Sequence, residues 1–485
     1  MGFLATLLLS IVFATLGVAR PRLAVYLVLM LFVFFDEQGL GFTTYRGSFV
    51  FNAFFVGFYG LRLIEVLTVS AYIPMLFMVR DRQQASQPFH AERLISFLFF
   101  SWIAILLAVE FAISGKASHS DWRLIVTGAM QFHMLVLTFR DESAVERLVQ
   151  FFLSLLALKA AYGLGMYAAG HGVLTPRGKL PFYWDSQQVQ AFGLGVVILT
   201  GYLLNYASLS ARHRIFPFAL ALLMWLLLVA AVGGSIRRTI WVMTFAGVLF
   251  MILLSKRSTF IHYFVILFAS AVAIAGLLLA PGLDDFRTHM GKYVESMNVF
   301  DEQQFSGNVE NSVHINNVES YLKMVTEKTD ILALGLHGPS GAQQYQMLMD
   351  IYSEGGYKLG MAHNGILRSI LFFGIFGAIL YVAVYAISLS RTWQIYRHAP
   401  EDNVLKHVAL ACGAFLLLDF APSLLFVPPF YTSSKGLFYA FFQIFIVGVV
   451  AWRLVPRAGR TTITVASPHA TEAPRVFARQ TVSKG

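Results

Sequence analysis

The sequence predicts an all-α fold, a polytopic transmembrane helix bundle of about 12 to 13 spans with one large extracytoplasmic helical loop. The chain of 485 residues is 57% hydrophobic and 13% charged, with a mean hydropathy of +0.66. Ordinary soluble domains are about 45–50% apolar and about 25% charged. Apolar runs also recur along the whole chain at roughly the 20-residue length that one span needs. Both observations indicate an integral membrane protein.

The expected spans are apolar runs with polar or basic residues at their ends. We interpret the first run as a retained span rather than a signal peptide, because no basic residue precedes it and Arg20 and Arg22 follow it. The phenylalanine-rich segment 46–60 could form an interfacial helix or part of another span, which leaves the side of the N-terminus open. The expected spans are 3–19, 23–35, 61–79, 94–113, 122–139, 148–169, 188–208, 216–232, 239–254, 259–280, 363–388, 407–427 and 436–452.

These spans divide the chain into four regions. We expect an N-terminal transmembrane bundle of about ten spans over 1–280, an extracytoplasmic loop domain over 281–362 and C-terminal transmembrane helices over 363–453. The loop is expected to form short helices lying over a cavity. Residues 454–485 have too little apolar surface to form a core, which predicts a disordered cytoplasmic tail.

Arginine and lysine predict the orientation of the bundle. In the expected topology most basic residues fall on one side, which the positive-inside rule makes cytoplasmic. The opposite side carries the long loop 281–362, so we expect the functional site on the extracytoplasmic face. The basic residues of the predicted cytoplasmic side are Arg20, Arg22, Arg80, Arg82, Arg93, Arg140, Arg147, Arg212, Arg214, Lys256, Arg257, Arg391, Arg397 and Lys406, together with those of the tail.

The composition also argues against several classes of function. The lone cysteine, Cys412, cannot build an intrachain disulfide or a cysteine-ligated metal site. The net charge of +10 is scattered singly at span ends rather than along a stripe, so nucleic acid is not an expected partner. The sequence contains no Asp-x-Asp motif, no phosphate-binding glycine loop and no dinucleotide fingerprint. We therefore expect no metal, no other cofactor and no nucleotide chemistry.

Two basic pairs break the positive-inside pattern on the predicted extracytoplasmic face. Arg237 and Arg238 follow the short loop 233–235, and Arg177 and Lys179 lie between the sixth and seventh spans. Guanidinium groups bind phosphate oxygens bidentately, which makes these side chains candidate ligands for a diphosphate. The alternatives are that Arg237 and Arg238 snorkel to lipid headgroups and that the other pair lies in a solvated loop.

His363 and Asn364 lie side by side where the long polar loop ends and a hydrophobic span begins. A polar pair at the mouth of a span can contact water, a lipid headgroup and a bound sugar, whereas the same pair at mid-bilayer would be costly. An imidazole titrates near neutral pH and can accept a hydroxyl proton, so His363 is a candidate general base. The alternative is a helix-capping or structural histidine.

Charged residues inside the expected spans are further candidates, because such residues usually face the bundle interior and mark pairs or pathways. Arg62 and Glu65 have i,i+3 spacing and are expected to pair on one helix face. Arg368 lies about one and a half turns beyond His363, so it could face the same cavity if the helix is tilted or bent. The charged residues in the expected spans are Arg62, Glu65, Lys159, Arg368 and Asp419.

Several of these segments resemble the O-antigen ligase and O-antigen polymerase superfamily, GT-C-like membrane glycosyltransferases whose large extracytoplasmic loop ends in His-Asn at the start of a span. The resemblance covers roughly residues 170–380. The family often has Asn-Pro-Asn where this chain has Trp184-Asp185-Ser186-Gln187-Gln188, and Ile236 leaves open which of the two following arginines is equivalent. The similar segments are His363-Asn364-Gly365-Ile366-Leu367, Phe373-Gly374-Ile375-Phe376-Gly377, Gly234-Ser235-Ile236-Arg237-Arg238, Arg177-Gly178 and Ile331-Leu332-Ala333-Leu334-Gly335-Leu336.

The resemblance implies glycan transfer from an undecaprenyl-diphosphate donor to an acceptor hydroxyl, with inversion at the anomeric carbon and without metal or nucleotide. It implies an active site on the periplasmic side of a bacterial inner membrane. The implied partners are the lipid-linked donor, a glycan or lipid A-core acceptor, the bilayer and other polysaccharide-assembly membrane proteins. The candidate catalytic residues are His363 and Asn364, and the resemblance makes Arg177 and Arg237 or Arg238 the candidate diphosphate ligands. Lys179 and Arg368 are further candidate diphosphate ligands by their charge and position in the sequence alone.

Three functions remain open from the sequence. A polymerase that extends a polysaccharide on its lipid carrier is slightly preferred, because nothing in the sequence specifies a lipid A-core acceptor. The alternative is an O-antigen ligase that moves the glycan to lipid A-core. A secondary transporter or flippase would also need many spans and buried charges, but we find no internal repeat, and a loop of about 80 residues is unusual for one.

Overall fold

The computed structural model describes residues 2–34, 57–58, 61–78, 89–114, 122–169, 173–175, 178–180, 186–235, 238–255, 365–423 and 434–456. All of the described helices and strands belong to the unit Met1–Val455. The remaining unit is Pro456–Gly485, of which only the first residue is described. The predicted span 259–280, the loop 281–362 and most of the tail 454–485 therefore lie outside the described residues.

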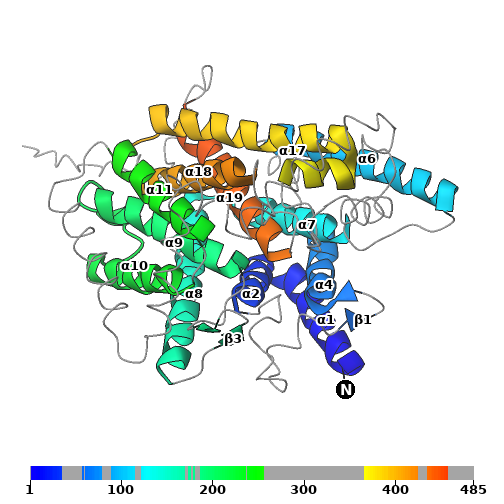
Figure 1. The fold of residues 1–485 in the computed structure, drawn as a ribbon, viewed down its shortest axis with the longest axis horizontal. Helices are drawn as coiled ribbons and strands as arrows, with labels where there is room; N and C mark the ends of the chain where they lie inside the picture. Colours follow the sequence, from blue (N-terminus) through cyan, green and yellow to red (C-terminus); the bar gives the residue numbers. More distant parts are fainter. Residues whose placement is uncertain are drawn as a thin grey trace, which may run out of the picture. The chain divides into compact units, whose positions relative to one another are not determined.

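Most of the described residues are helical (Figure 1). Two short antiparallel hairpins accompany the helices, one formed by β1 (Gly57–Phe58) and β2 (Leu61–Arg62), the other by β3 (Val173–Thr175) and β4 (Gly178–Leu180). The helices are α1 (Gly2–Ala19), α2 (Pro21–Phe34), α4 (Leu63–Met78), α6 (His90–Ser114), α7 (Trp122–Thr138), α8 (Glu142–Ala168), α9 (Ser186–Asn205), η3 (Ala211–His213), α10 (Phe218–Gly233), α11 (Arg238–Leu254), α17 (Gly365–His398), α18 (Val404–Ser423) and α19 (Ser434–Leu454).

Within the described ranges, 6 helical segments are long and apolar enough to cross a membrane. They are His90–Val109, Glu142–Met166, Gln188–Asn205, Ala211–Gly233, Phe373–His398 and Gly436–Leu454, and shorter apolar helices occupy Leu4–Ala19, Pro21–Phe34, Leu63–Phe77, Val126–Thr138 and Ile240–Leu254. These findings confirm a helical chain suited to a membrane, with a helix at each predicted span that the structure describes. α18 belongs to neither group, and its crossing of the membrane stays a prediction.

Two details differ from the sequence prediction. Arg62 does not share a helix face with Glu65, because Arg62 ends β2 and α4 begins only at Leu63. The helix predicted to end at residue 388 continues to His398 and is bent, because Gly374 interrupts its helical backbone.

The bend in α17 requires a glycine. Gly374 has φ 68° and ψ 176°, a combination that residues with a Cβ atom rarely adopt. The neighbouring helix α6 supports the bend, since Trp102 Nε1–H donates to the Phe373 carbonyl at 2.5 Å and the Trp102 ring contacts the Phe376 ring edge-on. α6 and α17 accordingly lie side by side (Figure 1).

α9 is the most enclosed of the long helices, and its apolar window is 100% buried. It packs against α8, α10, α11, α18 and α19. Its glycines allow this close approach. A Cβ atom on Gly193 would lie 2.5 Å from Thr244 Oγ1 of α11, and one on Gly195 would lie 2.8 Å from Leu228 of α10. Small residues at helix contacts are the usual means of close packing in membranes, where no hydrophobic force drives helices together.

The contacts between α9 and α11 show that these two helices run in the same direction and begin at the same level. The paired residues keep a constant offset of about 50 residues along both helices, as one axial rise per residue requires. Arg238, which begins α11, is therefore level with Gln188 near the start of α9. The pairs are Gly193 with Thr244, Val197 with Gly247, Gly201 with Met251 and Asn205 with Ser255.

Hydrogen bonds join the helix ends that carry the predicted cytoplasmic arginines. Arg22, in the first turn of α2, donates to the Thr138 carbonyl at 3.3 Å and lies 3.4 Å from the Asp141 carboxylate, both beside the α7–α8 turn. Arg453, near the end of α19, donates to the Arg140 carbonyl at 2.9 Å. These contacts connect three helix ends that are far apart in the sequence.

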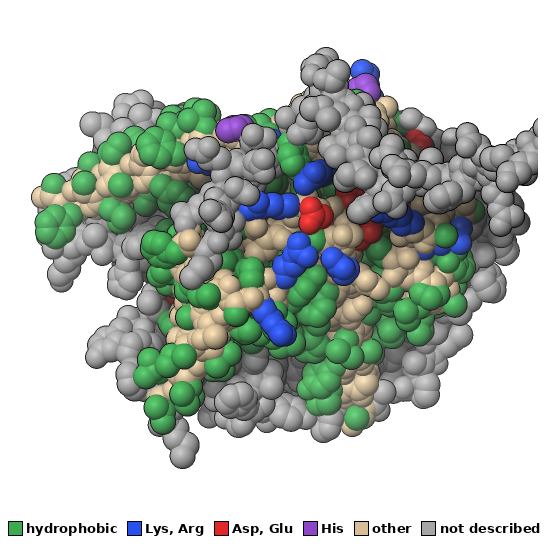
Figure 2. Space-filling model, turned by 180° about the vertical axis from the view of Figure 1, so that it is seen from behind, with side chains coloured by type: hydrophobic (Ala, Val, Ile, Leu, Met, Phe, Trp, Pro, Cys, Tyr) green, Lys and Arg blue, Asp and Glu red, His purple; other side chains and the backbone are tan. Residues whose placement is uncertain are grey.

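The same network reaches two further connections. His213 Nδ1 lies 2.6 Å from Glu146 Oε1 at the start of α8, and the Ser210 amide donates to the Asp402 carbonyl at 3.3 Å. The α1–α2, α7–α8, α9–α10 and α17–α18 connections and the end of α19 thus lie at one end of the bundle, called the basic end below. This grouping is the one that the distribution of basic residues predicts. Figure 2 shows Lys and Arg side chains gathered around acidic side chains, with hydrophobic surface beside them.

Replacement of Gly374 by alanine is expected to destabilise the fold by about 1–3 kcal/mol, because alanine cannot adopt the backbone conformation of the bend without strain. The apparent melting temperature of the detergent-solubilised protein would measure this loss. Gly165→Ala in α8 is the matched control, since an added Cβ atom there meets nothing within 4 Å. A Gly374→Ala variant as stable as the control variant would contradict the bend.

Replacement of Arg391 by methionine is expected to cost about 3–5 kcal/mol, because it leaves the carboxylate of Glu92 buried without its bidentate partner. The double variant Glu92→Met/Arg391→Met removes both charges and should recover most of this loss. Melting temperatures of the wild type, both single variants and the double variant measure the coupling. A double variant less stable than Arg391→Met would show that the ion pair is not the cause.

Candidate functional site

The structure describes the predicted site residues only in part. His363, Asn364, Arg177 and Arg237 lie outside the described residues. For the other three the backbone alone is described: Lys179 lies in β4, Arg238 begins α11, and Arg368 lies near the start of α17. The side-chain contacts of the predicted diphosphate ligands and of the histidine therefore stay predictions.

The helices beside these residues nevertheless converge. α9 follows the hairpin that contains Lys179, and its start is level with Arg238 at the start of α11. α18 runs antiparallel to α9, because Gln190, Gly193 and Gly201 in order along α9 approach Asp419, Phe415 and His407 in reverse order along α18. The two chain segments with the predicted basic pairs thus join the bundle at neighbouring helix starts, at the end opposite the basic end.

A buried carboxylate lies just inside this convergence. The Asp419 side chain accepts a hydrogen bond from Gln190 Nε2 at 3.0 Å on Oδ1 and one from the Tyr385 hydroxyl at 3.4 Å on Oδ2. Tyr381 donates to the Tyr385 hydroxyl at 3.3 Å, and the Tyr385 ring contacts Phe420. Asp419 is 3% exposed, and no Lys or Arg of the described residues forms an ion pair with it.

A second group of polar side chains lies on α9 and α19. The Tyr439 hydroxyl donates to Gln188 Oε1 at 3.3 Å, and Gln443 Nε2 donates to the Tyr439 carbonyl at 3.1 Å. All three residues are buried. The Oε1 atoms of Gln190 and Gln443 are also buried and have no hydrogen-bond donor among the described residues. Buried acceptors without a donor are costly, so these atoms can accept a hydrogen bond from water or a ligand.

The sequence reasoning identified Asp419 as an intramembrane charge but missed its partners Gln190 and Tyr385, and it missed Gln188 in the second polar group. A signal was present in the polar run Gln187-Gln188-Val189-Gln190 at the start of a long apolar segment. Tyr381 and Tyr385 also share one helix face at i,i+4 spacing. Neither pattern reveals that residues about 230 positions apart meet in the fold, which is why the cluster was missed.

Lys159, another predicted intramembrane charge, lies in α8 and donates from Nζ to the carbonyl of Phe34 at 2.8 Å. Phe34 is the last residue of α2, so the ammonium group satisfies a terminal carbonyl and complements the negative end of the helix dipole. Lys159 thus has a structural role in joining α2 to α8. Glu65 is 2% exposed in α4.

The part of the chain that the structure describes contains no candidate metal site. Within those ranges no group of three or more His, Cys, Asp or Glu side chains is arranged to hold a metal ion. The described chemistry around Asp419 consists of amide, phenol and carboxylate groups. Such groups orient helices and bind polar ligands through hydrogen bonds.

Comparisons with models of protein families and with curated proteins found no match to this chain.

The contact between Gln190 and Asp419 is expected to stabilise the fold directly. Gln190→Leu removes one donor from a buried carboxylate and should cost about 1–3 kcal/mol. In an Asp419→Asn background the same replacement should cost less, because the remaining amide carries no charge. Melting temperatures of the four proteins form a double-mutant cycle, and strictly additive effects would show that the two side chains do not interact.

Proposed function

We propose that this chain is a metal-independent, inverting glycosyltransferase of a bacterial inner membrane, which moves an oligo- or polysaccharide from an undecaprenyl-diphosphate donor to an acceptor hydroxyl on the periplasmic face. One observation carries the proposal: α11 begins at Arg238 level with the start of α9, the helix that follows the Arg177 segment. Two basic segments that the positive-inside rule disfavours thus join the bundle side by side. A bound anion would offset the positive charge of both segments.

In the proposed reaction the basic residues hold the donor diphosphate, and His363 accepts the proton of the acceptor hydroxyl. The hydroxyl oxygen forms a bond to the anomeric carbon from the side opposite the diphosphate. The bond between that carbon and the phosphate oxygen breaks, and the electron pair leaves with the diphosphate, so the configuration inverts. Arg177 with Arg237 or Arg238 stabilises the charge that develops on the leaving group, where preorganised electrostatics has its largest effect.

The remaining predicted residues have supporting roles in this proposal. Asn364 binds the acceptor sugar beside His363, and Lys179 and Arg368 add positive charge around the diphosphate. The hydrogen-bonded cluster at Asp419 holds α9, α17 and α18 together near the start of α9. Rigid helices of this kind keep binding groups in place, and catalysis depends on that placement.

Polymerase and ligase activities are distinguished by the acceptor. We prefer a polymerase, which extends the glycan on its lipid carrier, over an O-antigen ligase, which transfers the glycan to lipid A-core. Incubation of the purified protein with a lipid-diphosphate oligosaccharide, with and without lipid A-core, tests both. A longer lipid-linked glycan indicates the polymerase, and glycan on lipid A-core indicates the ligase.

Replacement of the proposed catalytic groups should greatly slow transfer while leaving the fold intact. His363→Ala is expected to lower the rate by about 10²–10⁴-fold through loss of the general base. Arg237→Ala/Arg238→Ala should lower it by about 10²–10³-fold or more through loss of leaving-group stabilisation. Arg212→Ala, at the exposed basic end, is the control and should keep full activity. Unchanged product yield in the His363 and Arg237/Arg238 variants would refute the assignment.

A secondary transporter or flippase is the second candidate, and the buried Asp419 favours it. Intramembrane carboxylates often mark proton or ion pathways. A flippase would move lipid-linked glycan across a proteoliposome membrane without changing its length, and Asp419→Asn would slow that movement. Glycan movement without any new glycosidic bond would replace the glycosyltransferase proposal.

A further inference from the structure

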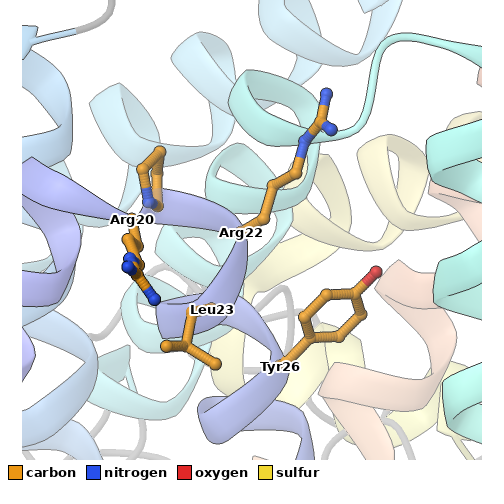
Figure 3. A pocket seen from close by; sticks show the side chains of 5 residues that line it. Arg20, Arg22, Leu23 and Tyr26 are labelled. Atoms are coloured by element: carbon orange, nitrogen blue, oxygen red, sulfur yellow. The ribbon is translucent and has the colours of Figure 1, made fainter.

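The turn between α1 and α2 forms a hollow of about 540 Å³, lined by Arg20, Pro21, Arg22, Leu23 and Tyr26 (Figure 3). Small-molecule sites typically have volumes of about 300–1,000 Å³. The exposed surface of this open hollow is mostly apolar and includes the half-buried ring of Tyr26, and Figure 3 shows the Arg20 and Arg22 side chains extending from the turn in different directions. The hollow lies at the basic end, away from the Asp419 cluster.

The two arginines of this hollow are not neutralised by the described residues. Arg20 is exposed and forms no ion pair there, whereas Arg22 pairs only with Asp141 at 3.4 Å. The Arg22 and Asp141 side chains are 46% and 66% exposed, and an exposed ion pair of this kind contributes little free energy. The Arg22 Nε–H donates to the Thr138 carbonyl, and the terminal nitrogens of its guanidinium group are available to a stronger anion.

Further positive charge surrounds the same turn. Arg147 is exposed, and both it and Arg22 act electrostatically on the Tyr26 hydroxyl. Arg140 has a buried Nε atom without a hydrogen-bond acceptor among the described residues, although its backbone carbonyl binds Arg453. The surroundings thus favour an anion with several oxygen atoms, such as a phosphodiester.

Apolar surface extends from the hollow along both helices. Leu23 and Met30 of α2 are exposed, and α1 exposes large apolar side chains along its length. Figure 2 shows hydrophobic surface next to basic side chains. An inorganic phosphate would use only the guanidinium groups, whereas a phospholipid would use the apolar surface as well. The exposed apolar residues of α1 are Leu4, Leu7, Leu8, Leu9, Ile11, Val12 and Val18.

We propose that the hollow at Arg20 and Arg22 binds the phosphodiester headgroup of an anionic phospholipid, with the acyl chains against α1 and α2. The bound lipid bridges the α1–α2 turn to the α7–α8 turn through Arg22, Arg140 and Arg147. Basic pockets between transmembrane helices bind anionic headgroups in this way. The site is independent of the proposed glycosyl transfer.

Native mass spectrometry of the full-length protein in detergent tests the site, with phosphatidylglycerol and phosphatidylcholine as the added lipids. Phosphatidylglycerol should bind more tightly than phosphatidylcholine. The Arg20→Gln/Arg22→Gln variant should bind phosphatidylglycerol about thirtyfold more weakly, from the usual contribution of two basic residues. The control Arg212→Gln/Arg214→Gln loses the same charge elsewhere at the basic end and should bind normally.

A variant with increased affinity provides an independent test if the double replacement disturbs the fold. Asp141→Asn removes the carboxylate that competes for Arg22 and keeps a good helix N-cap residue, so phosphatidylglycerol should bind several-fold more tightly. Equal weakening by both double variants, or equal binding of the two lipids, would overturn the proposal. Displacement of the lipid by millimolar inorganic phosphate would assign the hollow to free phosphate instead.

Discussion

The close packing of α9 against α11 and α18 determines where the polar residues of the candidate site can meet. α9 has no lipid-facing side in its buried window, and the glycines at Gly193 and Gly201 bring its backbone close to its neighbours. Close contacts repeated over about three turns leave little freedom to slide, because a displacement would drive side chains of one helix into the backbone of the other. The equal level of the two helix starts follows from this packing.

Buried polar contacts between helices add to this apolar packing and make the arrangement specific. A carboxylate such as Asp419 is costly inside a helix bundle unless its oxygens are hydrogen-bonded, and Gln190 and Tyr385 supply a donor for each oxygen. Lys159 similarly satisfies the carbonyl that ends α2. Because each contact joins different helices, the polar side chains select one arrangement among the many that apolar surfaces alone would permit.

The extent to which the sequence predicts the structure depends on the range of each interaction. The positions of the helices follow from local apolar composition, so the predicted spans and the described helices agree closely. Features that depend on contacts between helices could not be predicted from the sequence. In the sequence, Gly374 does not differ from other glycines in apolar helices, and the hydrogen bond from Trp102 of α6 that supports the bend is a tertiary contact. The start of α4 at Leu63, which excludes Arg62 from the helix, is also not evident from the apolar pattern. The link between Gln190 and Asp419 required the tertiary fold.

The two ends of the bundle differ in how their charges are used. At the basic end, several charges contact an opposite charge or a carbonyl group: Arg391 pairs with Glu92, His213 lies beside Glu146, and Arg453 binds a backbone carbonyl. At the other end, the described polar groups around Asp419 are uncharged amides and phenols. The proposed diphosphate of a lipid carrier would supply two negatively charged groups to arginines on that face. The proposal of lipid-linked glycan chemistry at this end rests on the predicted basic residues there, which the positive-inside rule disfavours.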